Sequence, residues 1–361
     1  MKTLGAVLLI VVLAAAAAGG YLWYSIEKPY GTMTAEGVYV TIPHGASRRT
    51  AGRLLEEAGV LRSGLAFEIY ARRHPKRTLV AGDYFFDHPV SGKDVFWKLA
   101  DGEVLVQPFT VKEGETIFDI AHDLETAKYM TAEAFLKAAQ DPSPIKDLFP
   151  DARSLEGFLY PATYNLPHHA TAADLTGMMV KKFREAVTRL APNGLKNAEG
   201  AESLGSVVTM ASLVERETPK PEERPVVAGV FTNRLEKNMP LQCDPTVIYA
   251  LQLDGNYRGT LTSRDLRMDS PYNTYVYKGL PPGPIGNPGE VALEAALHPA
   301  QTTYLYFVAN TQGGHFFSST LAEHNKNVAR YHRLLNGEPA DPPPTEAHHT
   351  HSGGKLHKGK G

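Results

Sequence analysis

The chain has 361 residues, and 37 Lys and Arg stand against 39 Asp and Glu, a formal charge of -2 at pH 7. This length exceeds one compact unit, so we expect a small accessory region beside a larger domain. No excess of positive charge is available to neutralise a phosphate backbone, which argues against nucleic acid as a partner. Cys243 is the only cysteine, which excludes an intrachain disulfide and a cysteine-based zinc or iron–sulfur site.

The amino-terminal segment predicts a membrane anchor. From Leu4 to Tyr24 the chain is uncharged, and it has about the 20 residues that a helix needs to cross roughly 30 Å of hydrocarbon. Lys2 holds the short leading end in the cytoplasm, and aromatic residues near Trp23 suit the opposite interface. We therefore expect residues 1–26 to form a single-pass anchor in the cytoplasmic (inner) membrane, with the rest of the chain in the periplasm or otherwise extracytoplasmic.

A cleaved signal peptide is the alternative for this segment. Ala16 to Ala18 precede Gly19 and form the small-residue pattern that signal peptidase accepts. The apolar run is longer than an ordinary signal-peptide core and continues past this point, which favours the retained anchor.

Residues 27–130 begin with a short linker at 27–32, and we expect them to form a small membrane-proximal region. The segment from residue 38 alternates apolar and polar residues, turns at Pro43 to Gly45, and continues as a helix that ends near Gly59. A second helix is expected around Phe67 to Ala71. An extended piece, a turn at Ser91 or Gly92 and a third helix carrying Val95, Phe96 and Leu99 come next.

A strand through Phe109 and Val111, a turn at Gly114, and a helix with Ile117, Ile120 and Leu124 on one face then form a strand-turn-helix unit. Its segment TVKEGETIFDIA resembles the opening of a LysM module, a small fold that binds chitin-like and murein glycans. The alternative is an ordinary strand-turn-helix unit of an α+β domain.

Residues 131–337 are expected to form the larger domain. Its first part, 131–200, is mostly helical in pattern, with interruptions at Asp141 to Pro144 and at LEGFLYPATYNLP, whose prolines and aromatics exclude a long helix. Residues 338–361 contain few apolar residues and are rich in Pro, Gly and His, which predicts a disordered tail. Its histidines could bind a transition metal, but a solvated tail is favoured because no scaffold fixes their geometry.

The segment SVVTMASLVERET predicts an amphipathic helix that carries two acids. Val207, Met210, Ala211 and Val214 lie on one arc, with Arg216 almost opposite, and Glu215 and Glu217 lie at the two edges of the arc. Partial burial would raise the pKa of either carboxyl and make it a proton donor near neutral pH. Spacing alone does not choose between them, and two ordinary salt-bridging acids are the alternative.

Several further motifs follow in order: ERPVVAGVFTNRLEKNMPLQCDPTVIYAL, SPYNTYVYKGLPPGPIGNPG and TTYLYFVANTQGGHFFSSTLAEHN. Together with LEGFLYPATYNLP and MASLVERET they resemble the endolytic murein transglycosylases of the MltG or YceG-like family, from about Leu155 to Tyr331. Within the E-x-E-T motif, the resemblance places the catalytic role on Glu217 and leaves Glu215 as a supporting acid. Cys243 stands where a small polar residue is expected in Q-x-D-P-T.

The resemblance implies a lytic transglycosylase, a carbon–oxygen lyase acting on polysaccharide. Glu217 would protonate the glycosidic oxygen between N-acetylmuramic acid and N-acetylglucosamine and then deprotonate the C6 hydroxyl, which gives a 1,6-anhydro end. Such an enzyme cuts within nascent strands and ends their elongation, near peptidoglycan synthases and the division or elongation machinery. No metal or organic cofactor is implied.

The remaining candidates would bind the glycan. Aromatic faces, amides and hydroxyls suit sugar rings and acetamido groups, and the candidates are Gln242, Asp244, Tyr272, Asn273, Thr274 and Tyr275. Asp244 is equally well explained as the cap of the helix TVIYAL, with Pro245 in its first turn. The Pro- and Gly-rich run 279–289 predicts a rigid loop that could wall a cleft, and His315 is expected to be structural.

The sequence therefore predicts an α+β protein with one transmembrane helix, a LysM-like membrane-proximal region and an α+β catalytic domain. Two other functions remain open. A murein glycan hydrolase would use Asp244 or Glu215 to activate water, and a noncatalytic scaffold would only bind murein.

Overall fold

The computed structural model describes residues 2–31, 37–167, 170–192 and 203–337. It divides into two compact units, each assembled from separate stretches of the chain. Unit 1 comprises Met1–Val111, Leu124–Ala138 and Ala162–Met178, and unit 2 comprises Lys112–Asp123, Ala139–Pro161 and Met179–Gly361. Helices α5 (Ile117–Thr126) and α7 (Ala172–Leu190) each contribute residues to both units.

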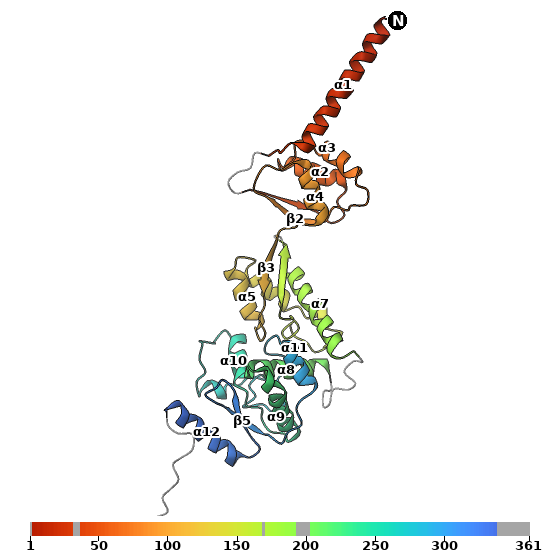
Figure 1. Ribbon diagram of the computed structural model, residues 1–361. Helices are drawn as coiled ribbons and strands as arrows, with labels where there is room; N and C mark the ends of the chain where they lie inside the picture. Colours follow the sequence, from red (N-terminus) through yellow and green to blue (C-terminus); the bar gives the residue numbers. More distant parts are fainter. Residues whose placement is uncertain (1, 32–36, 168–169, 193–202, 338–361) are drawn as a thin grey trace, which may run out of the picture. The chain divides into compact units, whose positions relative to one another are not determined.

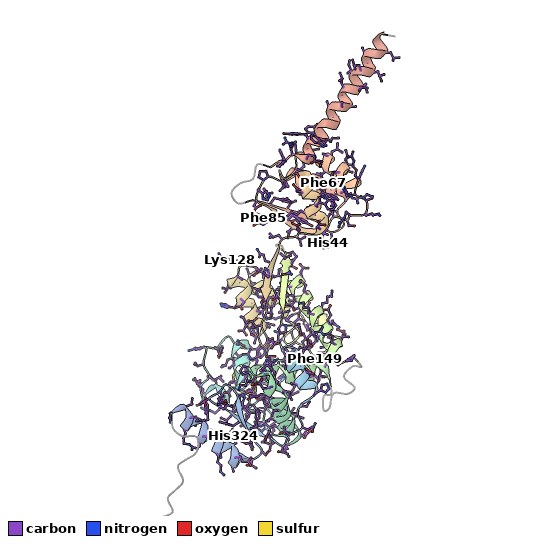
Figure 2. All side chains as sticks on the ribbon, in the orientation of Figure 1. His44, Phe67, Phe85, Lys128, Phe149 and His324 are labelled. Carbon is purple, nitrogen blue, oxygen red and sulfur yellow. The ribbon has the colours of Figure 1, made fainter. Side chains whose placement is uncertain are left out.

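Unit 1 mixes helices with two short sheets (Figure 1). Before residue 111 its elements are α1 (Lys2–Glu27), β1 (Val38–Ile42), α2 (Arg48–Glu57), α3 (Gly64–Arg72), β2 (Gly82–Phe86), α4 (Gly92–Asp101) and β3 (Val106–Thr110). The strands and helices predicted between residues 38 and 101 are thereby confirmed. Strands β1 and β2 pair antiparallel, and Phe67, labelled in Figure 2, is fully buried in the core beneath the helices.

Short-range capping explains where these helices begin. Ser47, Ser63 and Ser91 precede α2, α3 and α4, and each side chain accepts a hydrogen bond from a backbone N–H in the first turn. Each cap satisfies a donor that the helix cannot satisfy itself, which typically contributes about 1 kcal/mol. Helix α4 ends at Gly102, whose left-handed φ of 70° suits glycine.

Helix α1 is the one helix among the described residues that is long and apolar enough to cross a membrane. Its segment Leu4–Glu27 has a mean hydropathy of 2.3, and the most apolar part is not buried by the protein. Its last turn is packed, because Ile26 is 7% exposed and belongs to the core of unit 1. The expected linker is also attached to unit 1, because the backbone of Tyr30 pairs with that of Val90.

The expected strand-turn-helix is present as β3 followed by α5, although the strand ends at Thr110. One strand was not predicted: β4 (Thr163–Pro167) forms from the end of LEGFLYPATYNLP and pairs antiparallel with β3. Its alternating burial places Tyr164 and Leu166 inward, and the paired partner lies more than fifty residues earlier in the chain. Helix α6 (Ala132–Ala139) lies between them in sequence.

Unit 2 is mainly helical (Figure 1). Its elements are the short 3₁₀ turns Ser143–Ile145, Pro221–Glu223 and Asp265–Arg267, α8 (Leu204–Glu217), α9 (Arg224–Glu236), α10 (Asp244–Leu253), α11 (Glu290–Leu297), β5 (Tyr306–Ala309), β6 (His315–Ser318) and α12 (Leu321–Leu335). Helices α8 and α9 each pack against α11, and β5 and β6 form an antiparallel hairpin next to α12. The predicted tail, 338–361, lies outside the described residues.

The helix that carries both acids is more deeply buried than an amphipathic pattern predicts. Every residue of α8 is buried except Ser206, Arg216 and Glu217. Its polar residues Thr209 and Ser212 make this possible, because both hydroxyls donate to carbonyls of the preceding turn. The side of α8 opposite the apolar arc is also largely covered, since the 281–289 loop and helices α9, α10 and α11 pack around the helix.

Candidate active site

The end of α8 places two glutamates in different surroundings two residues apart. The helix stops at Thr218, whose extended backbone (φ -135°, ψ 129°) precedes Pro219. Glu217 is the last helical residue, and Glu215 lies in the same final turn. The negative end of a helix dipole disfavours a carboxylate here, so both acids need other support to ionise.

Glu215 has that support. Its Oε1 accepts from Arg224 at 2.5 Å, its Oε2 accepts from the backbone N–H of Gly289 at 3.0 Å, and the side chain is 4% exposed. Burial raises the pKa of Glu215, while the Gly289 N–H and the Arg224 charge oppose this shift. A Cβ at position 289 would collide with Glu113. Both oxygens are thus held by the protein, which makes Glu215 a supporting residue.

Glu217 has little support. Among the described residues the one hydrogen bond to its carboxyl comes from the Cys243 thiol, whose Sγ lies 3.3 Å from Oε2. Burial raises the pKa of Glu217; the thiol and the nearby His315 lower it, and the charge of Asp244 adds to the increase. A half-buried carboxyl whose pKa is raised by burial and which has a free oxygen is suited to general acid catalysis.

Cys243 is held in position by two threonines. Its backbone N–H donates to Thr274 Oγ1 at 3.0 Å, its carbonyl accepts from Thr246 Oγ1 at 2.7 Å, and the two hydroxyl oxygens are 2.9 Å apart. Burial raises the pKa of the thiol well above its ordinary value. The side chain is therefore a neutral donor toward Glu217, and the departure from a small polar residue preserves a hydrogen bond.

His315 and Glu223 form a second pair beside the acid. The Nδ1 of His315 lies 2.7 Å from Glu223 Oε2, the His315 N–H donates to Oε1 at 2.9 Å, and Thr218 donates to the same carboxylate at 3.1 Å. Burial opposes ionisation of Glu223, but the hydrogen bonds from His315 outweigh it and lower the pKa of Glu223. His315, expected only as a structural residue, thus contributes to the charge around Glu217.

Three of the predicted glycan-binding residues are accessible near the start of α10. Gln242 and Asp244 are exposed and Tyr275 is half-buried. The Tyr275 hydroxyl donates to Asp244 Oδ1 at 2.5 Å, which fixes the ring beside the residue that follows Cys243. The helix cap is Cys243 rather than Asp244, so the expected capping role of Asp244 was wrong and its carboxylate is directed to Tyr275.

The other three are turned into the protein. Asn273 is fully buried, and its side chain bonds to the backbone of Leu266, Met268 and Tyr275. Thr274 is 1% exposed and bonds to Thr246 and Cys243. Tyr272 packs its half-buried ring against Tyr249, with centroids 5.1 Å apart. These residues shape the loop that presents Tyr275.

Two buried arginines and one further glutamate were not identified from the sequence. Arg224 bonds to Glu215, and Arg234 donates to the carbonyls of Leu241 and Leu305 at 2.8 and 2.6 Å, which fixes the chain just before Gln242. Glu156 lies in the LEGFLYP motif and accepts from the Ile117 N–H and the Asn287 amide, both at 3.1 Å. All three residues lie in the sequence motifs that resemble the family, and this position is the feature of the sequence that could have identified them.

The arrangement offers one acid of raised pKa with a free oxygen, an exposed carboxyl at Asp244 and an accessible tyrosine. No group of three His, Cys, Asp or Glu in the described part of the chain is placed to hold a metal ion. This geometry suits acid–base chemistry on an uncharged substrate.

Comparisons with known proteins agree with the resemblance in the motifs. The model of the YceG-like family matches residues 40–330. A protein of Bacillus subtilis named endolytic murein transglycosylase is 35% identical over 87% of this chain and 90% of its own length. One of the same name from Streptococcus pneumoniae is 32% identical over 87% of this chain and 62% of its own length.

A solved structure gives the same result. The crystal structure of a yceG-like protein from Listeria monocytogenes is 34% identical, covers 81% of this chain and 99% of its own, and superposes with a TM-score of 0.56. With a family model that spans both units and relatives above 30% identity over most of their length, the chain belongs to the YceG-like family.

Proposed function

We propose that this protein is an endolytic lytic transglycosylase that cuts the bond between N-acetylmuramic acid and N-acetylglucosamine in peptidoglycan strands, with Glu217 as its acid and base. The names of the relatives support this activity. The observation that carries the role of Glu217 is its contrast with Glu215: burial raises the pKa of both acids, but Glu217 has a free oxygen and Glu215 is bound on both oxygens.

The reaction needs one group that gives and then takes a proton. Glu217 donates its proton to the O4 of the leaving N-acetylglucosamine as the C1–O4 bond breaks. The C6 hydroxyl of the same N-acetylmuramic acid then forms the new C1–O6 bond, and its proton returns to the Glu217 carboxylate. No water is consumed, and the enzyme ends the cycle in its starting state.

The surrounding charges suit both halves of this cycle. Burial raises the pKa of Glu217 and so favours its protonated form at the start, whereas the Cys243 thiol and the neighbouring His315 stabilise the carboxylate once the proton has left. An acid is most useful when its pKa lies near the working pH, and these opposed effects move it in that direction. Gln242, Asp244 and Tyr275 are proposed to contact the glycan, while Asn273, Thr274 and Tyr272 hold their loop.

Two rival activities lead to different products. A hydrolase would need a second carboxylate to activate water, and Asp244 is the accessible candidate because Glu215 is fully engaged. Mass analysis of purified murein after digestion separates these cases, since a 1,6-anhydro product is lighter by one water than a hydrolytic one. A reducing end would indicate a hydrolase, and unchanged murein would indicate a noncatalytic scaffold.

The remaining proposals concern location and binding. Residues 1–26 would anchor the chain in the cytoplasmic membrane with both units outside the cytoplasm, close to peptidoglycan synthases and the division or elongation machinery. The segment TVKEGETIFDIA lies in the strand-turn-helix formed by β3 and α5, which supports a LysM-like glycan-binding role within residues 27–130. Binding of murein sugars by a variant with Glu217 replaced by Gln tests that role apart from cleavage.

A further inference from the structure

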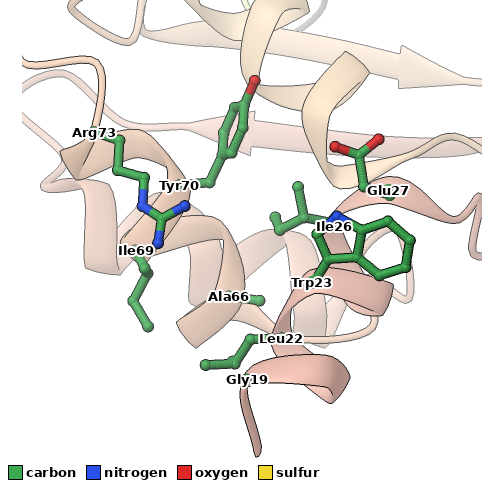
Figure 3. A pocket seen from close by; sticks show the side chains of 9 residues that line it. All are labelled: Gly19, Leu22, Trp23, Ile26, Glu27, Ala66, Ile69, Tyr70 and Arg73. Atoms are coloured by element: carbon green, nitrogen blue, oxygen red, sulfur yellow. The ribbon is translucent and has the colours of Figure 1, made fainter. Parts of the chain in front are cut away.

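The end of the anchor helix and helix α3 enclose a groove in unit 1 (Figure 3). It has a volume of about 200 Å³. Its lining includes Leu22, Trp23 and Glu27 on α1, and Ile69, Tyr70 and Arg73 on or just after α3. Neither the glycan chemistry nor the family comparison assigns a role to this groove.

The groove is a fixed part of unit 1. Ile26 lies in the core, and a Cβ added at Gly92 of α4 would approach its side chain to 2.9 Å. Ser25 is also buried, and its hydroxyl bonds to the carbonyl of Tyr21 at 2.8 Å. Since α1 packs against both α3 and α4, both walls of the groove belong to one packed unit.

The groove would lie at the outer boundary of the membrane. A helix rises about 1.5 Å per residue, so a hydrocarbon core of roughly 30 Å that begins near Leu4 ends near Trp23. The α1 wall runs from Gly19 to Glu27, or about 12 Å across that boundary. Trp23 is 63% exposed beside it, as expected for an aromatic residue in the interfacial belt.

The chemistry of the groove changes along this direction. In Figure 3 the side chains of Leu22 and Ile69 lie toward the Gly19 end, and the Glu27 carboxylate lies toward the other. Leu65 adds an exposed apolar side chain, 60% accessible, on α3. The deep end is therefore suited to a fatty acyl chain, and the outer end is suited to a charged headgroup.

The groove has one basic and one acidic side chain, and the two do not form an ion pair with each other. Arg73 lies on one wall and Glu27 on the other (Figure 3), and no described residue forms an ion pair with either side chain. A guanidinium binds phosphate well. Glu27 is the last residue of α1, where the helix dipole also favours a cation. Such a pair fits a zwitterion.

We propose that this groove binds one phospholipid with a phosphoethanolamine headgroup from the outer leaflet. Its phosphate lies on Arg73, its ammonium lies on Glu27 at the end of α1, and one acyl chain runs along Leu22 and Ile69. The proposal rests on the membrane anchor and is independent of the glycan chemistry. A bound lipid would fix the depth and tilt of unit 1 at the membrane surface.

Native mass spectrometry of the detergent-purified full chain tests this proposal. The protein is offered phosphatidylethanolamine, phosphatidylglycerol and phosphatidylcholine with identical acyl chains. We expect one retained phosphatidylethanolamine, because phosphatidylglycerol lacks the cation and the quaternary ammonium of phosphatidylcholine cannot donate to Glu27. Arg73→Ala and Glu27→Gln should each lower the bound fraction about tenfold or more, as expected for one charge-assisted hydrogen bond.

Arg72→Ala is the matched control, since it removes the neighbouring charge but Arg72 points to Glu68 at 2.5 Å. Its lipid retention should equal that of the parent. Equal retention of the three lipids, or a preference that survives Glu27→Gln, overturns the proposal, and so does a parent protein that stays soluble without detergent. Murein cleavage by the same preparations is measured separately: its absence would count against the proposed enzyme and leave the lipid result intact.

Discussion

The two glutamates of α8 should respond in opposite ways to the same substitution. Glu215→Gln removes one charge of an ion pair whose side chains are 4% and 6% exposed. Breaking a buried pair on one side typically costs about 3–5 kcal/mol. Arg224 keeps Glu113 at 3.3 Å, so we expect the lower end, about 3 kcal/mol. For a domain of 150–250 residues this corresponds to a melting temperature lower by about 6–12 °C.

Glu217→Gln should not destabilise the protein. The Glu217 carboxyl is desolvated, with the Cys243 thiol as its one hydrogen-bond donor among the described residues, so a neutral amide cannot acquire the unfavourable charge that ionisation would place at the end of a helix. Stability should stay level or rise by about 0.5–2 kcal/mol, as is common when an active-site strain is relieved. Formation of the anhydro product should fall by at least about 10²–10⁴-fold.

Thermal unfolding and murein digestion of both variants, at a temperature where both are folded, measure the two effects. Glu215→Gln should lose about tenfold or less in rate. Glu113→Gln is the control, because Glu113 also contacts Arg224 but is 47% exposed, so its loss should cost under about 1 kcal/mol. If Glu217→Gln destabilised the protein as much as Glu215→Gln, or if Glu215→Gln were stable and inactive, the assignment of roles would be reversed.

Three other predictions follow from the site and the anchor. Cys243→Ala removes the donor that stabilises the Glu217 carboxylate, so the descending limb of the pH–rate profile should move to a higher pH by about one pH unit. The profile of Cys243→Ser should stay near that of the parent. Identical profiles for the parent and both variants would contradict the role of the thiol. Burial raises the pKa of Glu156 to about 8 from 4.5, so the native state keeps a proton that the unfolded chain releases, and stability should decline by a few kcal/mol between those pH values. Glu156→Gln should flatten that decline in urea titrations, and a parent whose stability increases with pH in this range would show the opposite sign. A reporter fused after Gly361 should be active only outside the cytoplasm, and cytoplasmic activity would reverse the topology.

Local elements of this fold were predictable because their causes are local. The helices after Ser47, Ser63 and Ser91 are each started by a side chain that bonds within the first turn, and such signals are contained in a few residues. Strand β4 had no comparable signal. Its residues pair with β3 across more than fifty positions of chain, and a Pro-flanked segment looks irregular until its partner is known.

The periodicity of the sequence also did not indicate how deeply α8 is buried. A helix with Thr209, Ser212 and Arg216 on its polar side reads as half-exposed. In the structure the two hydroxyls bond to backbone carbonyls and Arg216 donates to the carbonyl of Gly114 at 2.9 Å. Polar side chains that find partners can be buried at little cost, so polarity alone did not report exposure.

The separation of roles between Glu215 and Glu217 has the same origin. Both acids share a helix turn, an end of the dipole and a residue type, so nothing local distinguishes them. Their different partners are distant in sequence: the Gly289 N–H that binds Glu215 is 74 residues away along the chain, and the Cys243 thiol that binds Glu217 is 26 residues away. Burial raises the pKa of both carboxyls, but donors hold both oxygens of Glu215 and Glu217 has a single weak donor, so the acid proposed to carry the catalytic proton is the one from which hydrogen-bond partners are withheld.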